Sequence, residues 1–400
     1  MPDTRRHALV IGAGLAGAAA CSALAQRGWR ITLLDTADGP ASGASSLPVG
    51  MLSPHVTRTP TPLSRLSALG VADTLAELRR LVPEGAGWQA CEVDNLGHDP
   101  GRWPAALVRP SALVQAWLDE AKRLSALTCL WNTQVHRLGA QTGGDPASPT
   151  VWQALDSQGR LLAEAPVVIV AAALGTVNLL AAQAGQLAAG DLPLRPVQGQ
   201  MSLAALDGPA LAERPQRNDG VFVPRYEDSG LSPRWPTTIW TMGSTYERGL
   251  SDTRVSVEAH ERNARSLQSI EPAAADRLRL DLAHGRLMGW AQVRCASLDR
   301  LPMVGAAPDT AALRDLFATR PGQRHRVRLP NVPRWPGLFL LSAMGSRGLT
   351  LAHWCAEQLA MQLSGEPSSA EPDLLEALDP ARFALKNARR SVATERATTS

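Results

Sequence analysis

The sequence predicts an α/β protein with two domains, one built on a parallel sheet and one that is α+β and mostly antiparallel. Three observations predict this fold. The apolar run at residues 8–11 leads into Gly-x-Gly-x-x-Gly and an Ala/Leu-rich helical pattern. A second apolar run at 30–34 ends in an acid, as in a β-α-β unit that binds a dinucleotide. From residue 192 the chain changes to short alternating runs rich in Pro, Arg and Trp. The first domain is therefore predicted to be Rossmann-like.

Each glycine of the opening motif has a separate physical task. Gly12 permits the tight turn from strand to helix, Gly14 lets backbone N–H groups approach a pyrophosphate, and Gly17 lets the helix pack closely on the strand. The helix at 15–26 offers free N–H groups and the positive end of its dipole to phosphates. Asp35 lies roughly 20 residues further on, where an acceptor for a ribose hydroxyl is expected. The pattern predicts a dinucleotide site, and a glycine-rich turn without a ligand is the alternative.

Composition excludes several classes of protein. The chain carries 40 basic and 37 acidic side chains, a net charge of +3, which is typical of neither a nucleic-acid-coating nor a membrane-surface protein. The five cysteines form no Cys-x-x-Cys pair, so we expect reduced thiols, a cytoplasmic protein and no metal site. We expect no signal peptide, because the first strand starts at once. The uncharged stretch at 165–190 contains Pro, Gly and Asn, so we interpret it as a buried strand and a helix, not a membrane span.

Secondary structure in the first half is predicted from periodicity and turn signals. Residues 39–54 form a long loop of small residues, which either runs along a bound cofactor or is an ordinary solvated loop. The remaining elements are helices at 62–81 and 109–118, strands at 127–131, 133–138 and 167–172, and a hairpin at 150–163. The last of these strands ends in small residues, which would again let a cofactor come close.

The end of the chain repeats the opening pattern. An apolar strand at 337–341 leads through a glycine-rich turn into a helix at 349–363, which indicates a return to the first domain. We therefore predict a first domain over 1–190, with an excursion near 86–107 into a second domain over 191–334. Residues 335–368 return to the first domain, and 369–400 form a polar C-terminal tail whose last dozen residues are predicted to be disordered.

Several sequence blocks carry a resemblance to a known family. The blocks are 43–45, 50–54, 194–200, 294–305, 345–349 and 377–383. Together they resemble the superfamily of D-amino-acid oxidase and glycine oxidase. Within it they resemble most the FAD-dependent oxidoreductase domain of the bifunctional tRNA 5-methylaminomethyl-2-thiouridine biosynthesis proteins. That family carries an N-terminal methyltransferase. We therefore expect this chain to correspond to the oxidoreductase half alone, with a separate methyltransferase as a candidate partner.

The resemblance implies a non-covalently bound FAD in the first domain, with a substrate domain laid over it. The residues implied for the cofactor lie at strand ends and in glycine-rich turns: Gly12, Gly14, Leu15, Ala16, Gly17, Asp35, Ala44, Ser45, Gly50, Met51, Leu52, Val135, Ala172, Gly175, Gly345, Ser346, Arg347, Gly348 and Leu349. The implied reaction oxidises a carboxymethylaminomethyl group on the wobble uridine of tRNA. It releases the carboxymethyl group as glyoxylate and leaves aminomethyluridine.

Such a reaction needs an anchor for the substrate carboxylate, and arginine suits it because its planar fork binds a carboxylate through two bonds. The resemblance places Arg294 at the position of this anchor, with Arg347, between two glycines, as the second catalytic candidate. The alternatives are a surface ion pair for Arg294 and, for Arg347, a group that biases the charge of the flavin. Cys295 is expected to be an inert buried thiol, and covalent attachment of the flavin is the alternative.

The spacing of residues does not assign a role to two further groups of side chains. The candidate acid–base residues, each expected to be structural, are His55, Tyr226, Tyr246 and His353. A basic group surrounds His325 and either contacts tRNA phosphates near the mouth of the site or forms a solvated loop; its members are Arg320, Arg324, Arg326, Arg328 and Arg334.

Three functions follow from this reading. The first is a tRNA-modifying FAD oxidoreductase, and the second is an amine oxidase acting on free glycine, sarcosine or a D-amino acid. The third is a flavin-binding protein without catalysis. The carboxylate anchor serves the first two equally, so the width and charge of the mouth of the site must distinguish them. The oligomeric state does not follow from the sequence.

Overall fold

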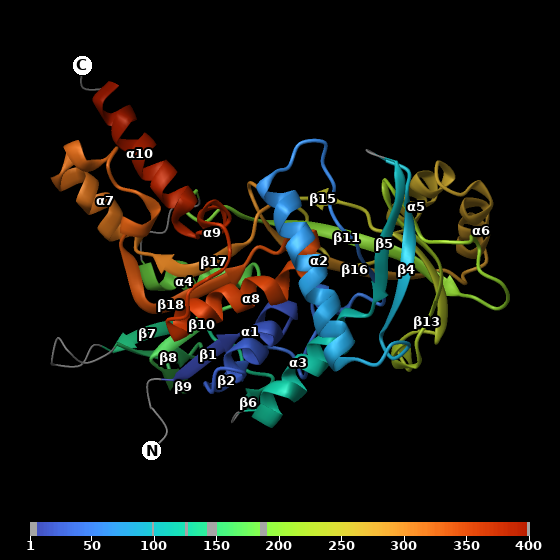
Figure 1. Ribbon diagram of the computed structural model, residues 1–400, viewed down its shortest axis with the longest axis horizontal. Coiled ribbons are helices and arrows are strands. Elements are labelled where there is room, and N and C mark those ends of the chain that lie inside the picture. Colours follow the sequence, from blue (N-terminus) through green and yellow to red (C-terminus); the bar gives the residue numbers. More distant parts are fainter. Residues whose placement is uncertain (1–5, 98–99, 125–126, 142–149, 185–189, 398–400) are drawn as a thin grey trace.

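Two large sheets organise the chain in this computed structural model, which describes residues 6–97, 100–124, 127–141, 150–184 and 190–397. They lie beside each other along the long axis of the molecule (Figure 1). The six-stranded sheet has the order β17-β18-β10-β1-β2-β6, and the nine-stranded sheet contains β3 to β5 and β11 to β16. A small third sheet is formed by β7, β8 and β9. The predicted combination of an α/β part with a mostly antiparallel α+β part is confirmed.

The six-stranded sheet is built on β1 (His7–Ile11), which pairs in parallel with β2 (Arg30–Leu34) and β10 (Val167–Val170). Further out, β6 (Leu127–Leu130) is parallel to β2, and β18 (Arg334–Ser342) is parallel to β10. Strands at the centre of a parallel sheet are covered on both faces, which is why β1 and β10 are apolar and buried after their first residues.

One face of this sheet is covered by four helices: α1 (Leu15–Ala25), α2 (Pro62–Leu81), α3 (Pro110–Leu124) and α8 (Gly348–Ser364). Helix α1 contacts both α3 and α8 along its length, because it is rich in alanines that leave little volume between the helices. A Cβ atom added at Gly70 of α2 would lie 2.2 Å from the carbonyl oxygen of Thr350, so α2 and α8 also cross closely.

The other face carries α4 (Gly175–Ala184) and the small antiparallel sheet of β7 (Arg137–Gln141), β8 (Val151–Leu155) and β9 (Leu161–Ala165). The predicted hairpin at 150–163 is confirmed as β8 and β9. The predicted strand at 133–138 begins later, at Arg137, because residues 133–136 cross the carboxyl edge of the sheet as loop.

The nine-stranded sheet is antiparallel except for the pair of β12 and β4. Its strands are β3 (Gly50–Leu52), β4 (Trp88–Asn95), β5 (Gly101–Val108), β11 (Leu194–Ala205), β12 (Gln216–Asn218), β13 (Gly220–Glu227), β14 (Thr238–Gly243), β15 (Glu247–Arg248) and β16 (Met288–Ser297). Helices α5 (Val257–Gln268) and α6 (Pro272–Ala283) pack on one of its faces.

The observed elements differ from the predicted division of the chain at two places. β17 (Met303–Pro308) pairs antiparallel with β18, so the chain rejoins the six-stranded sheet at Met303 and not at 335. The stretch 369–400, predicted as a polar tail, contains α9 (Pro372–Leu378) and α10 (Ala381–Ala397). Helix α10 packs on α7 (Thr310–Thr319) through small and apolar residues that composition alone did not reveal as a helical face. The domain limits themselves stay a prediction.

No helix within the described ranges combines the length and the apolar composition needed to cross a bilayer.

Candidate functional site

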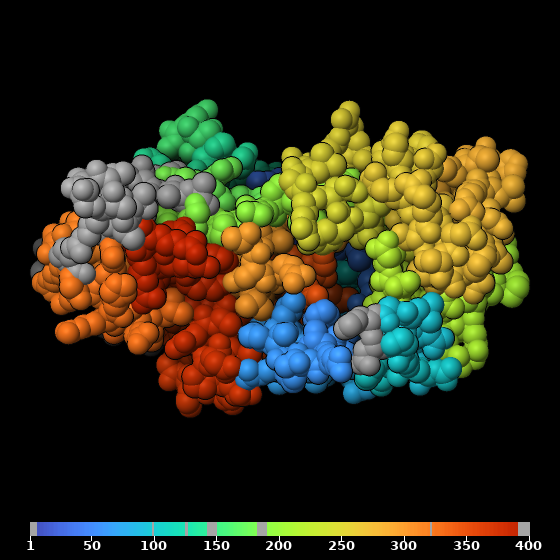
Figure 2. Space-filling view, turned by 90° about the horizontal axis from the view of Figure 1, so that it is seen from above, coloured from blue at the N-terminus to red at the C-terminus, as the bar shows by residue number. Residues whose placement is uncertain are grey.

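A cavity of about 950 Å³ lies between the two large sheets, at the carboxyl ends of β1, β2, β10 and β18. Strands β3, β11, β13, β14 and β16 of the nine-stranded sheet close its other side. Figure 2 shows an opening on one face of the molecule, bordered by the blue segment that leads into α2, the light-orange turn after β16 and the lime strands around β12 and β13. Ligands of open α/β sheets bind at this edge, so the cavity is where the sequence motifs predict a site.

The turn between β1 and α1 forms one end of the cavity. Gly12 has a φ of +109°, and a Cβ atom there would lie 2.6 Å from the carbonyl oxygen of Ala171. At Gly17 the same atom would lie 1.7 Å from the carbonyl oxygen of Gly12, so the helix could not pack against its own turn. Gly14 is the N-cap of α1 and carries no side chain that could fill the space beside the helix terminus. The predicted tasks of Gly12 and Gly17 in the backbone are therefore visible in the geometry.

The carboxylate of Asp35 lies against this turn. Its Oδ2 accepts from the N–H of Ala13 at 2.6 Å, and its Oδ1 accepts from the N–H of Ala37 at 2.9 Å. The hydroxyl of Ser45, in a short 3-10 helix (Ala44–Ser46), accepts from the N–H of Leu15 at 3.0 Å. The loop at 39–54 thus runs over the N-terminus of α1, where polar groups converge on the space that phosphates and a ribose would occupy.

Most of the predicted cofactor residues line the cavity. They are Gly12, Gly14, Leu15, Ala16, Asp35, Ala44, Ser45, Gly50, Met51, Val135, Ala172, Gly175, Gly345, Ser346, Gly348 and Leu349. Gly17, Leu52 and Arg347 are not among the lining residues: Gly17 faces the turn, and Leu52 is fully buried in the core. These positions agree with a cofactor that extends along the cavity, and the individual contacts stay predictions.

Arg294 lines the opposite part of the cavity, on β16. Its Nη1 donates to Ser346 Oγ at 2.9 Å, and its Nη2 donates to Ser244 Oγ at 2.6 Å and to the carbonyl oxygen of Thr245 at 3.3 Å. The guanidinium carbon lies 5.8 Å from the ring centre of Tyr246. Within the described part of the chain no carboxylate pairs with Arg294, and burial lowers its pKa from the ordinary value. The alternative of a surface ion pair therefore does not describe this arginine.

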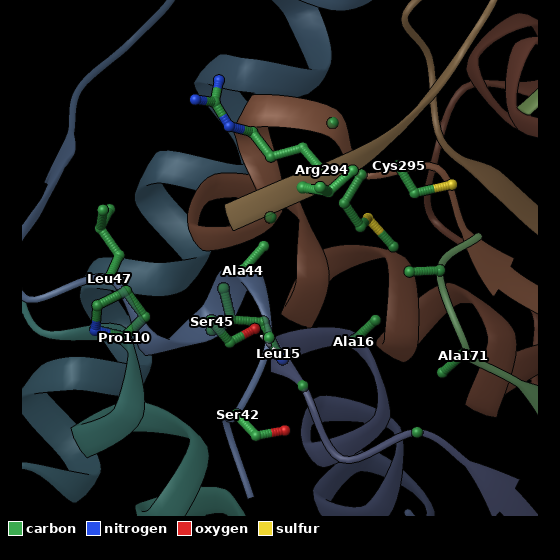
Figure 3. A pocket seen from close by; sticks show the side chains of 18 of the residues that line it. Leu15, Ala16, Ser42, Ala44, Ser45, Leu47, Pro110, Ala171, Arg294 and Cys295 are labelled. Carbon is green, nitrogen blue, oxygen red and sulfur yellow. Dashed lines mark hydrogen bonds between the residues drawn. The ribbon is translucent and has the colours of Figure 1, made fainter. Parts of the chain in front are cut away.

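Cys295 follows Arg294 and extends to the other side of β16, as alternation along a strand requires (Figure 3). It is buried against Ser342, and burial raises the pKa of its thiol to about 11. A thiol with this pKa is protonated at neutral pH and is a poor nucleophile. The environment therefore favours the inert thiol over a covalent attachment to flavin.

Of the four candidate acid–base residues, Tyr246 alone lines the cavity. Tyr226 is buried elsewhere and donates to Asp228 Oδ2 at 3.0 Å, and His353 is enclosed between α2 and α8. His55 follows β3 in the loop that leads to α2. Among the lining side chains that sequence reasoning did not place here are Ser244 and Trp290, whose Nε1 donates to Ser46 Oγ at 3.0 Å. Trp290 and Arg294 share a face of β16, so strand alternation from Arg294 was a signal for it.

The basic group around His325 is not at the cavity. None of its five arginines lines the cavity in the described chain. They lie between α7 and β18, at the far end of the six-stranded sheet from the nine-stranded sheet (Figure 1). Arg334 is bound to Asp379 at 2.8 Å. Of the two alternatives for this group, a position at the mouth does not agree with the structure, because β17 and β18, between which the group lies, form the outer edge of the six-stranded sheet. Contact of these arginines with tRNA is not tested by this position.

The site and fold define an FAD-dependent oxidoreductase. The sequence profile of the family described as FAD dependent oxidoreductase (DAO) matches residues 7–107 and 102–362, so the chain belongs to this family. The glycine turn, the N–H groups of α1 and the length of the cavity fit FAD, which is the cofactor of the family.

Two curated relatives carry one more specific name. The tRNA 5-methylaminomethyl-2-thiouridine biosynthesis bifunctional protein MnmC of Verminephrobacter eiseniae is 36% identical over 96% of this chain and 64% of its own length. The protein of the same name from Delftia acidovorans is 37% identical over 95% of this chain and 61% of its own length. The chain thus spans a little under two thirds of these relatives.

Solved structures share the fold at low sequence identity. Glycine oxidase from Geobacillus kaustophilus superposes with a TM-score of 0.68 at 18% identity, covering 94% of this chain and 99% of its own. Iminodiacetate oxidase from Chelativorans sp. BNC1 gives a TM-score of 0.64 at 19% identity, covering 93% and 98%. At such identities the likeness establishes the fold alone.

Proposed function

We propose that this chain removes the carboxymethyl group from carboxymethylaminomethyl-(2-thio)uridine at the wobble position of tRNA, releasing glyoxylate and leaving aminomethyluridine. The names of relatives that match almost the whole chain support the substrate class. The single observation that carries the chemistry is Arg294, a half-buried guanidinium in the cavity without a carboxylate partner among the described residues. A carboxymethyl group supplies that partner.

FAD, when bound, accepts a hydride equivalent from the carbon between the amine and the carboxylate. The residues of this chain bind and orient the substrate for that step. Ser244 and Ser346 hold the guanidinium of Arg294 from two sides, so its free edge presents a fixed fork to the carboxylate. The positive charge of Arg294 and the apolar walls formed by Met201 and Val293 both disfavour a protonated substrate amine, whose lone pair the oxidation needs.

The test of this function is reduction of the flavin without oxygen, with modified tRNA or free glycine offered separately. We expect rapid bleaching of the flavin absorbance by tRNA that carries the carboxymethylaminomethyl group, and release of glyoxylate. Efficient reduction by free glycine or sarcosine, with no response to the modified tRNA, would instead establish the small-molecule amine oxidase.

The role of Arg294 has its own test. Arg294→Lys keeps the positive charge but loses the planar fork and cannot bond Ser244 and Ser346 together, so turnover should fall on the order of 100-fold. The flavin content should stay at the wild-type level. As a control, Arg225→Lys changes an exposed arginine of β13 that pairs with Glu227. Unchanged flavin reduction by Arg294→Lys would place the anchor elsewhere.

We further propose that the enzyme acts in the cytoplasm and that its product amine is methylated by a separate methyltransferase. The word methylaminomethyl in the names of the relatives supports the second step. Fractionation of cells tests the location. Nucleoside analysis tests the second step, because tRNA from a strain that contains this enzyme but lacks the methyltransferase should accumulate aminomethyluridine.

A further inference from the structure

Three arginines from distant parts of the chain border the opening of the cavity. Arg217 lies on β12 just before Asp219 and Gly220, which line the cavity. Arg300 lies in the turn between β16 and β17, and Arg347 stands between the lining residues Ser346 and Gly348. The light-orange turn after β16 and the lime segment around β12 border the opening seen in Figure 2. We call Arg217, Arg300 and Arg347 the rim arginines.

The guanidinium of Arg217 is held in place by neutral acceptors. Its Nε donates to Asn95 Oδ1 at 3.1 Å, and its Nη1 donates to Ser53 Oγ at 2.8 Å and to the carbonyl oxygen of Pro54 at 3.1 Å. These bonds join β4, β12 and the loop after β3 beside the opening. They fix the position of the charge without neutralising it.

The other two rim arginines form no side-chain ion pair within the described ranges. The acid next to Arg300 is occupied, since Asp299 binds Arg382 through two bonds of 2.8 and 3.0 Å. The carboxylate of Asp219, two residues after Arg217, accepts from Ser266 Oγ at 2.8 Å, and no ion pair joins it to Arg217 in the described chain. Other arginines of the protein do form ion pairs with carboxylates. Arg109, for example, binds the buried carboxylate of Asp228 at 2.7 Å. Within the described ranges, the three rim arginines therefore carry positive charge without a carboxylate bound to any of them.

The three charges act on one another and on a common neighbour. The pKa of His55 is lowered by burial and then by Arg347, Arg217 and Arg300, and that of Arg347 is lowered by burial and by Arg300. His55 stands two residues after Ser53, which binds Arg217. Like charges held this closely destabilise one another unless an anion joins them, and an oxygen-rich dianion or diester is the anion that several guanidinium groups bind best.

We propose that Arg217, Arg300 and Arg347 form a binding site for a backbone phosphate of the RNA strand whose modified base enters the cavity. This inference rests on the proposed tRNA substrate. In this arrangement the arginines have two different tasks. Arg294, inside the cavity, binds the carboxylate of the modified base, and the rim arginines bind the phosphodiester outside the cavity. The rim arginines hold the strand while the base reaches inward, and they give the enzyme its preference for a polynucleotide over a free amino acid.

The test is binding of a fluorescent anticodon stem-loop to the FAD-loaded protein by anisotropy at several salt concentrations. Arg300 is exposed, so Arg300→Glu should fold normally and keep its flavin. We expect an affinity about tenfold lower, and a slope of log affinity against log salt that is smaller by about one. The matched control is Arg320→Glu, the same charge reversal at an exposed arginine at the end of α7. Arg217→Gln gives a second rim variant, with the same expected direction.

Three results would overturn the proposal. Wild-type affinity and slope in Arg300→Glu and Arg217→Gln would exclude a phosphate at the rim. An equal loss in Arg320→Glu would mean that RNA binds through diffuse surface charge. Inorganic phosphate alone, titrated by calorimetry, separates the two sources of the anion. Submillimolar binding that is lost in Arg300→Glu would assign the rim to a free anion and not to RNA.

Because the binding test needs no turnover, it is independent of the proposed reaction. If the stem-loop binds in a rim-dependent way but the modified tRNA does not reduce the flavin, the reaction is wrong and the rim site stands. If the flavin is reduced and the rim variants bind as the wild type does, the reaction stands and the rim site is wrong.

Discussion

Gly199 shapes the candidate site by leaving space for the anchor. It lies on β11, which pairs with β16, and a Cβ atom there would come within 1.5 Å of Nη2 of Arg294. A methyl group would therefore push the guanidinium away from Ser244. This role explains why a glycine occurs in the middle of the buried strand β11.

Gly199→Ala should lower turnover on the order of 100-fold, because displacement of an anchor by about 1 Å is sufficient for such a loss. FAD content should be unchanged, since Gly199 is far from the turn after β1. Steady-state kinetics and flavin absorbance measure the two quantities. Gly139→Ala on β7 is the control, because its added Cβ atom would meet no atom closer than 3.5 Å. Normal kinetics in Gly199→Ala would show that Arg294 does not need its observed position.

Asp35 combines two tasks in one carboxylate, and this gives a second prediction at the residue scale. It fixes the turn through the N–H of Ala13 and stands where a ribose hydroxyl is expected. Asp35→Ala should raise the dissociation constant for FAD about tenfold, since a charged hydrogen bond is lost. Equilibrium dialysis or fluorescence of released FAD measures this, with the exposed Asp38→Ala as control. Equal affinity in both variants would remove Asp35 from the cofactor site.

At the scale of elements, the contact between α2 and α8 contains a buried ionisable network. His353 of α8 stacks on Trp117 of α3 at 5.5 Å, and its Nδ1 lies 2.9 Å from Asp73 Oδ2. Its Nε2 lies 3.2 Å from Glu77 Oε2. Burial lowers the pKa of His353, but the hydrogen bond and charge of Asp73 and the charge of Glu77 more than offset this, so the pKa is raised above its ordinary value.

The raised pKa predicts a dependence of stability on pH. A group whose pKa is higher in the folded state stabilises fully below its unfolded value, about 6.5, and loses this contribution as pH rises through its folded pKa. The free energy of unfolding should therefore fall as the pH rises above about 6.5 and through the raised pKa of His353, and His353→Gln should remove this part of the slope. Urea unfolding at several pH values tests it, with the exposed His284→Gln as control. An identical slope in His353→Gln would contradict the assignment.

At the scale of the whole molecule, the C-terminal helices tie the end of the chain to the rim of the cavity. Arg382 of α10 binds Asp299 in the turn that carries Arg300, and Asp379 binds Arg334 at the start of β18. Leu374, Leu378 and Ala381 are buried beneath them.

A chain shortened to end at residue 370 should therefore melt several degrees lower than a chain that ends at 397, because it exposes an apolar face and removes the partners of Arg334 and Asp299. Its affinity for RNA should also fall, since the turn of Arg300 loses its support. Thermal unfolding followed by flavin release gives the first quantity and anisotropy the second. Equal melting of the two chains would show that α9 and α10 are not part of the fold.

Local sequence signals were sufficient to predict those parts of the site whose function depends on backbone conformation. The turn at Gly12 to Gly17, the acid after β2 and the late glycine turn before α8 were all predicted from short motifs, because each needs particular residues within a few positions of one another. The return of the chain was placed at 335 and not at Met303, because β17 is an antiparallel edge strand without a motif of its own. The helices after residue 370 were missed for a similar reason: their apolar face is too narrow to stand out in a polar composition.

The sequence by itself determined the fold class, the dinucleotide site and Arg294 as the candidate anchor, since these depend on local geometry and on blocks of adjacent residues. Only the tertiary structure decided which charges gather beside the cavity. Arg217, Arg300 and Arg347 are separated by many residues and share no spacing, whereas the adjacent arginines from 320 to 328 look more like a binding surface in the sequence. Strand pairing between distant segments brings the first three to one opening and leaves the others at the far end. Charge acts through distance in space, and that distance is set by the pairing of the strands.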